Sequence, residues 1–93
     1  MRITWDPKKA AVNLRKHGID FQESATVFTD TLSATFPSVD HSENEVRFLT
    51  IGLSASMQLL VVAHTEADDI VRIISARRAT GQERRFYEKK PTS

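Results

Sequence analysis

The sequence predicts a single α+β domain, with an antiparallel sheet of about four strands, a short strand before it, two N-terminal helices and one C-terminal helix. Three observations support this fold class. Helix boundary signals occupy the N-terminal third, a period of two with β-branched and aromatic residues begins at Leu32, and a helix-capping pattern follows the last predicted strand. Because 93 residues supply one core and not two, we assign residues 2–90 to one domain and 91–93 to a short tail.

The first predicted elements are a short strand at residues 2–5 and a helix at residues 8–17. Asp6 is a favourable N-cap, Pro7 suits the first helical position, and Gly18 is a typical C-terminal stop. These signals agree with one another, so we expect the helix to begin and end at these residues.

The two N-terminal helices are predicted to be amphipathic. Ala10 and Leu14 form the narrow apolar stripe of the first helix. Asp20 and Glu23 have the spacing of a capping box, and apolar residues recur at helical intervals through Phe28. We therefore expect a second, short helix in this segment.

Four strands and a final helix are predicted in the rest of the chain. The strands are expected at residues 32–36, 46–53, 59–65 and 70–76. Because the connectors between them are short and rich in turn residues, neighbouring strands should be antiparallel. Thr80 and Glu83 then form a T-x-x-E capping box that opens a helix running to about Lys90 before Pro91. We expect one face of the sheet to be covered by helices.

Composition excludes several classes of function. The chain has no cysteine, which rules out disulfides, thiolate nucleophiles and cysteine-based zinc sites. No apolar run is long enough to span a membrane and no signal-peptide core is present, so a cytoplasmic protein is expected. The net charge is only +1, but both ends are basic and the middle is acidic. If the fold brings the ends together, they would form a cationic surface suited to a phosphate backbone.

The C-terminal segment holds the densest group of candidate site residues. Arg77, Arg78, Arg84 and Arg85 lie within nine positions. A guanidinium grips phosphate through two parallel hydrogen bonds, but its permanent charge makes it a poor proton carrier. Arg77 and Arg78 should point to opposite sheet faces if the strand reaches them. In the last helix, Phe86 is expected to contact the core, which leaves Tyr87 for the site.

Candidates for proton transfer are less distinct. His64 lies late in an apolar strand, where an imidazole is either hydrogen-bonded within the structure or part of a site. His17, at a helix C-terminus, more simply stabilises the helix dipole, and His41 lies in an acidic, loop-like stretch. The three histidines lack metal-ligand spacing and the three glycines are isolated, so neither a metal site nor a glycine-rich phosphate loop is predicted.

Four basic residues of the first helix allow two interpretations. They are either the solvated face of an amphipathic helix or a surface that binds RNA: Lys8, Lys9, Arg15 and Lys16. Arg84 could likewise pair with Glu88 one helical turn away. The residue pattern alone supports a phosphate-binding α+β domain.

Four ordered motifs resemble a known family. They are I-T-W-D-P-K-K at residues 3–9, N-L-R-K-H-G-I-D-F at 13–21, E-V-R-F with I-G at 45–52, and S-A-R-R-A-T with E-R-R-F-Y-E at 75–88. Together they resemble the BrnT toxins of bacterial type II toxin–antitoxin systems, over about residues 2–90.

The resemblance implies a RelE-like fold and a ribonuclease activity that blocks translation. It also implies cleavage without metal or other cofactor, and a ribbon-helix-helix antitoxin of the BrnA type in a two-plus-two complex. The family motifs place candidate catalytic residues at Arg47, Arg77, Arg84, Arg85 and Tyr87. His64 is a further candidate beside them, and Arg78 is a candidate for contact with RNA or antitoxin.

Two functional hypotheses follow from the sequence. The first is a metal-independent endoribonuclease toxin that cleaves RNA and inhibits translation. The second is a non-catalytic module that binds nucleic acid and acts with a DNA-binding antitoxin. Both use the basic ends of the chain, but only the first requires the sheet to bring Arg47 beside the C-terminal arginines.

Overall fold

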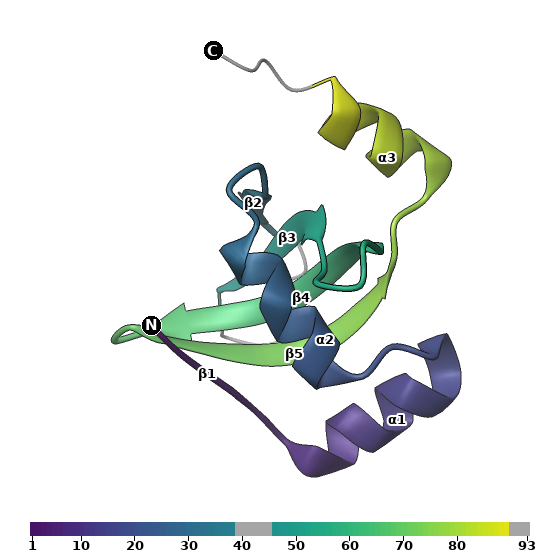
Figure 1. Cartoon of the computed structure of the whole chain (residues 1–93). Coiled ribbons are helices and arrows are strands. Elements are labelled where there is room, and N and C mark those ends of the chain that lie inside the picture. The colour runs from purple at the N-terminus through teal and green to yellow at the C-terminus, as the bar shows by residue number, and fades with distance from the viewer. Residues whose placement is uncertain (39–45, 90–93) are drawn as a thin grey trace.

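A computed structural model of the chain describes residues 1–38 and 46–89. Its elements are β1 (Arg2–Trp5), α1 (Pro7–His17), α2 (Phe21–Thr26), the 3-10 helix η1 (Val27–Thr29), β2 (Ala34–Pro37), β3 (Arg47–Leu53), β4 (Leu59–Ala67), β5 (Ile70–Arg78) and α3 (Gly81–Glu88). Figure 1 shows α2 crossing β4 and β5, with α3 following the end of β5. The predicted α+β class and its order of elements are confirmed.

The five strands form one mixed sheet in the order β1-β5-β4-β3-β2. The antiparallel meander from β2 to β5 is confirmed, and β1 joins its β5 edge in parallel. Asp68 and Asp69 have positive φ angles of 52° and 67° in the two-residue turn between β4 and β5. Such a turn matches the twist of the strands it joins and fixes their register.

Most predicted boundaries are confirmed within a few residues, and the differences have local causes. Pro7 is the first residue of α1, and the Asp6 and Gly18 caps are present. Strand β2 begins two residues later than predicted, because the Asp30 side chain and carbonyl accept hydrogen bonds from the amides of Leu32 and Ser33 and form a turn there. The last helix ends at Glu88, two residues before the expected end near Lys90, whereas the 91–93 tail and His41 lie outside the described residues.

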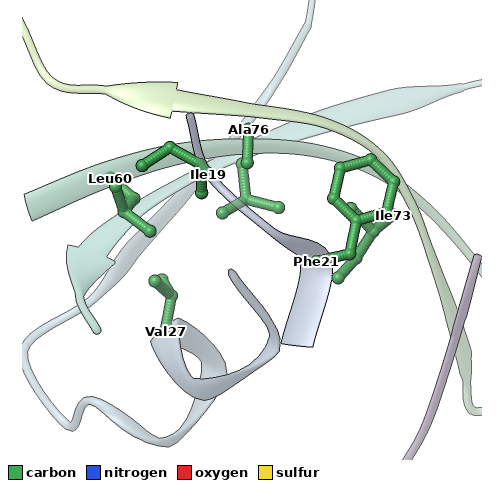
Figure 2. Packing of buried hydrophobic residues seen from close by; sticks show 7 residues of the cluster. Ile19, Phe21, Val27, Leu60, Ile73 and Ala76 are labelled. Atoms are coloured by element: carbon green, nitrogen blue, oxygen red, sulfur yellow. The ribbon is translucent and has the colours of Figure 1, made fainter. Parts of the chain in front are cut away.

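The main core lies between the sheet and the two N-terminal helices. Its fully buried members are Ile19, Phe21, Val27, Leu60, Val62, Ile73 and Ala76. Figure 2 shows these side chains pointing toward one another from the sheet and from the segment that contains α2 and η1. We call this side of the sheet the helix face.

The buried side of α1 differs from the predicted apolar stripe. Leu14 is 51% exposed, whereas Asn13 is only 4% exposed. The Asn13 amide nitrogen donates to the carbonyls of Ile19 and Ala76, and its oxygen accepts from the Ala76 amide, at 2.9–3.0 Å. Because β1 pairs with β5 only up to Ile73, Asn13 satisfies a stretch of β5 edge that no strand covers.

Among residues 1–38 and 46–89, α3 is the helix that packs on the opposite side of the sheet, and it covers only part of it. Ile51, Leu59 and Val61 form a second buried cluster there, against which Ala79 and Tyr87 pack. We call this side the open face. Successive residues of a strand point to opposite faces, so Leu60 and Val62 serve the main core while Leu59 and Val61 serve this one.

Candidate functional site

The sheet register places two arginines in one row on the open face, on either side of a threonine. Arg47 of β3 and Arg72 of β5 are both direct partners of Thr65 in β4. Their neighbours Phe48, which stacks on buried His64, and Ile73, a member of the main core, point to the helix face. Arg47, Thr65 and Arg72 therefore form a row on the open face, which we call the arginine row, with Cα atoms about 5 Å apart between neighbours.

Arg77 lies on the same face at the far end of β5, because the register shift opposite Ala63 and His64 returns it to the face of Arg72. Its strand partner is Val61, four residues from Thr65, which corresponds to about 13 Å along the strand. The Arg77 guanidinium donates from Nη1 and Nη2 to Oε1 and Oε2 of Glu83, at 2.8 and 2.9 Å. This hydrogen-bonded pair lowers the pKa of Glu83 to about 2. Glu83 therefore remains an anion and is a weak base at neutral pH.

Glu83 also shapes the start of α3. Its Oε1 accepts a hydrogen bond from the Thr80 amide, and the Thr80 hydroxyl accepts one from the Glu83 amide, so the predicted capping box is confirmed. One carboxylate thus links the helix start to Arg77 at the end of β5. The local sequence signal that begins α3 also sets the position of the helix over the open face.

A hollow of about 220 Å³ lies between α3 and the sheet. Its lining is apolar except for one carboxylate: Phe36, Leu49, Ile51, Val61, Glu83 and Phe86. We call it the apolar hollow. Leu49 is two residues from Arg47 along β3, and Val61 is the partner of Arg77. The apolar hollow therefore extends over β2, β3 and β4, from the level next to the arginine row to the level of Arg77.

The structure reverses the expected roles of Phe86 and Tyr87. Phe86, predicted as the core contact of α3, is 47% exposed. Tyr87 instead packs on the second cluster, and its hydroxyl donates to Oδ2 of Asp30 at 2.6 Å. The same Oδ2 accepts from the Leu53 amide at 2.8 Å. Burial and the neighbouring carboxylate raise the pKa of Tyr87 to about 12. The hydrogen bond between this hydroxyl and Asp30 fastens α3 to the end of η1.

The other C-terminal arginines do not converge on one point. Arg84 and Arg85 are exposed on α3, and Arg84 lies 3.9 Å from Glu88, as helical spacing allows. Arg78 points away from Arg77, as strand alternation predicts. It donates to the Gln58 side chain at 3.1 Å and to the carbonyl of His17 at 3.0 Å, where it stabilises the C-terminus of α1.

His64 does not join the arginines. It lies on the helix face, fully buried between Phe28 and Phe48, with Nε2 2.7 Å from the Thr50 hydroxyl. Burial lowers its pKa, and the Glu66 carboxylate acts in the opposite direction. Of the two roles considered for His64, the contacts fit the structural one, in which the imidazole is hydrogen-bonded within the fold.

The basic residues of α1 lie at the uncovered edge of β5. Lys8, Lys9 and Lys16 border a second hollow of about 310 Å³ beside Ile74 and Ser75, and Arg15 is exposed on the same helix. This surface belongs to the edge of the sheet, whereas the arginine row belongs to its open face.

Arg72 is a candidate site residue that the sequence analysis missed. The two-residue turn at Asp68-Asp69 was the available signal, because it makes Thr65 the partner of Arg72. Across residues 1–38 and 46–89, no group of three histidine or carboxylate side chains is placed to hold a metal ion, and no helix is long and apolar enough to cross a membrane.

Comparison with known proteins identifies the family. Residues 5–83 match the family model described as the ribonuclease toxin BrnT of type II toxin–antitoxin systems. The chain belongs to the BrnT family. The crystal structure of the Brucella abortus ribonuclease toxin BrnT superimposes with a TM-score of 0.67 at 25% sequence identity, covering 86% of this chain and 97% of that one. A search of curated proteins gave no match.

Membership of the BrnT family confirms the resemblance drawn from the four motifs. It makes this chain a ribonuclease toxin of a type II system, which implies an RNA substrate and a cognate antitoxin. The shared fold, with its five-stranded mixed sheet and three helices, also matches the solved BrnT structure. The family does not by itself assign roles to the individual arginines.

Proposed function

We propose that this BrnT-family chain is a metal-independent endoribonuclease that cuts RNA on the open face of its sheet and thereby inhibits translation. The observation that carries the proposal is the common face of Arg47, Arg72 and Arg77. Three fixed cations around one open surface suit the backbone of a single RNA strand.

The chemistry assigned to these arginines is electrostatic. When the 2′-oxygen of a ribose attacks the adjacent phosphorus, the 5′-oxygen of the next nucleotide leaves and negative charge accumulates on the phosphoryl oxygens. Guanidinium groups stabilise that charge without exchanging protons. We assign Arg47, Arg72 and Arg77 to the phosphate, which competes with Glu83 for the guanidinium of Arg77.

Arg84 and Arg85 extend this surface along α3, and the α1 residues Lys8, Lys9, Arg15 and Lys16 offer a second basic surface for a longer RNA. Arg78 and His64 receive structural roles from their contacts. Tyr87 remains a candidate proton donor only if RNA binding releases it from Asp30. Metal independence is proposed from the family resemblance.

The partner proposed for this toxin is a BrnA-like ribbon-helix-helix antitoxin in a two-plus-two complex in the cytoplasm. The open face supports this assignment, since its apolar hollow and arginines would both be accessible to a protein that blocks the site. Co-expression followed by measurement of the mass of the complex tests the stoichiometry.

Cleavage of RNA by the purified chain with excess chelator tests the proposed activity. Arg47→Ala, Arg72→Ala and Arg77→Ala should each reduce cleavage by at least tenfold, because each removes a transition-state contact. Leu14→Ala, at an exposed position of α1 outside the open face, is the control and should retain activity. Loss of wild-type cleavage with chelator would contradict the metal-free mechanism. RNA binding without cleavage would favour the non-catalytic module.

A further inference from the structure

The apolar hollow has features that a phosphate-binding surface does not need. Phe36 and Phe86 are 41% and 47% exposed at its rim, although aromatic side chains of this size are usually well buried. Their ring centroids are 5.3 Å apart and their planes meet at 64°. In this edge-to-face arrangement, the ring that offers its edge keeps both of its own faces free of the other ring.

We propose that the apolar hollow is a nucleobase slot, in which a base of the RNA strand stacks on one ring of the Phe36–Phe86 pair and contacts the other, while the flanking phosphates lie on the arginine row and Arg77. The inference rests on the proposed function, because it assumes that RNA crosses the open face. It adds two substrate-positioning residues to the arginines of the site.

The size and position of the apolar hollow suit one base. A volume of about 220 Å³ is below the range of pockets that enclose drug-sized ligands, so it suits a single ring system. The floor of Leu49, Ile51 and Val61 extends over β3 and β4 from the level next to the arginine row to the level of Arg77. A strand with phosphates on Arg47 and Arg77 crosses from β3 to β5 and can place a base over this floor.

Charge distinguishes a base from other occupants. The Glu83 carboxylate in the lining repels a phosphate or an acidic peptide, so an anion belongs on the arginines outside the hollow. Among the described residues, Oε1 of Glu83 accepts from both Arg77 and the Thr80 amide, whereas Oε2 accepts from Arg77 alone. The second lone pair of Oε2 is thus available for an N–H group on the edge of a base.

Stacking on aromatic side chains is the usual way in which proteins hold unpaired bases, and it tolerates different sequences. The loss of one stacked base corresponds to about 5- to 100-fold in affinity. Phe36 comes from an edge strand and Phe86 from α3, so the slot forms only when α3 is fastened over the sheet. Tyr87 and Asp30 supply that fastening.

The test compares two uncleavable oligonucleotides that carry equal charge, a 2′-fluoro oligoadenylate and an abasic backbone of the same length. Wild-type protein should bind the first about 5- to 100-fold more tightly in fluorescence anisotropy. Phe36→Leu and Phe86→Leu retain apolar side chains but remove the rings. Each should lower this ratio several-fold, and the double variant should bring it near one, with affinity for the abasic backbone unchanged. Leu32→Ala, another exposed apolar side chain, should keep the wild-type ratio.

A wild-type ratio near one, or ratios unchanged in the Phe variants, would overturn the slot and leave the hollow to an apolar side chain of a protein partner. Cleavage of an all-ribose oligoadenylate is measured in parallel. Discrimination without cleavage would support the slot and refute the ribonuclease activity proposed above. Cleavage without discrimination would refute the slot and support the ribonuclease activity.

Discussion

Removing the Tyr87 hydroxyl tests whether this residue fastens α3 or transfers a proton. Tyr87→Phe keeps the ring that packs on the second cluster and deletes the hydrogen bond to Asp30. The deleted hydrogen bond has a carboxylate acceptor, and a bond of this kind contributes about 1.5–3 kcal/mol of stability. Because the ring is only partly buried, we expect about 1–2 kcal/mol, or a melting temperature lower by about 5–15 °C.

The sign of the pH dependence follows from the raised pKa of Tyr87. The folded chain holds the tyrosine proton more tightly than the unfolded chain, so the contribution is complete below about pH 10 and is lost as pH rises toward 12. Since Tyr87 is the only tyrosine, the ultraviolet absorbance of tyrosinate follows it directly. Asp30→Asn should move the midpoint back toward 10, because it removes the carboxylate charge.

Cleavage assays separate the two roles. If Tyr87 positions α3, then Asp30→Ala, which also removes the acceptors of the Leu32 and Leu53 amides, should reduce cleavage at least as much as Tyr87→Phe. If Tyr87 is a general acid or base, only Tyr87→Phe should lower kcat by about 10²–10⁴-fold. A native titration midpoint near 10, with the stability of Tyr87→Phe unchanged, would refute the fastening argument.

Three further outcomes are expected. Asn13→Ala leaves three buried backbone groups without their hydrogen bonds and should lower the free energy of unfolding in urea by about 3 kcal/mol or more. Leu14→Ala, at the exposed neighbouring position, should change it by less than about 0.5 kcal/mol. Similar values for the two variants would contradict the role of Asn13 at the β5 edge. The buried His64 should make stability fall as pH drops from about 7 through its lowered pKa, and His64→Gln should flatten that slope; an equal slope in both proteins would place the titrating group elsewhere. Glu83→Gln weakens the pair with Arg77 and should raise affinity for an abasic oligonucleotide in anisotropy; unchanged affinity would mean that Arg77 does not reach the phosphate.

Local signals predicted the elements of this fold because their causes are local. The Asp6 cap, Pro7 and Gly18 define α1 within a few residues, and the Thr80–Glu83 capping box begins α3 in the structure as in the sequence. The change to a period of two marked the strands, and short turns made them antiparallel. The same alternation correctly separated Arg77 from Arg78.

Side chains whose environment depends on distant parts of the chain were harder to predict. Leu14 follows the apolar period of α1 but is exposed, because the open edge of β5 requires the amide of Asn13 instead. Phe86 and Tyr87 exchange their expected roles because Asp30, 57 positions away from Tyr87, accepts its hydroxyl. No pattern within one helix carries that information.

The sequence by itself determined the α+β class, the order of the elements, the family and the arginine-rich character of the site. Only the tertiary structure decided which arginines share a face. Arg47 and Arg72 meet across Thr65 because two hairpin registers align them, while His64, next to Thr65 in the chain, points into the core. A strand turns successive side chains to opposite faces, so one residue of register separates a site residue from a buried one.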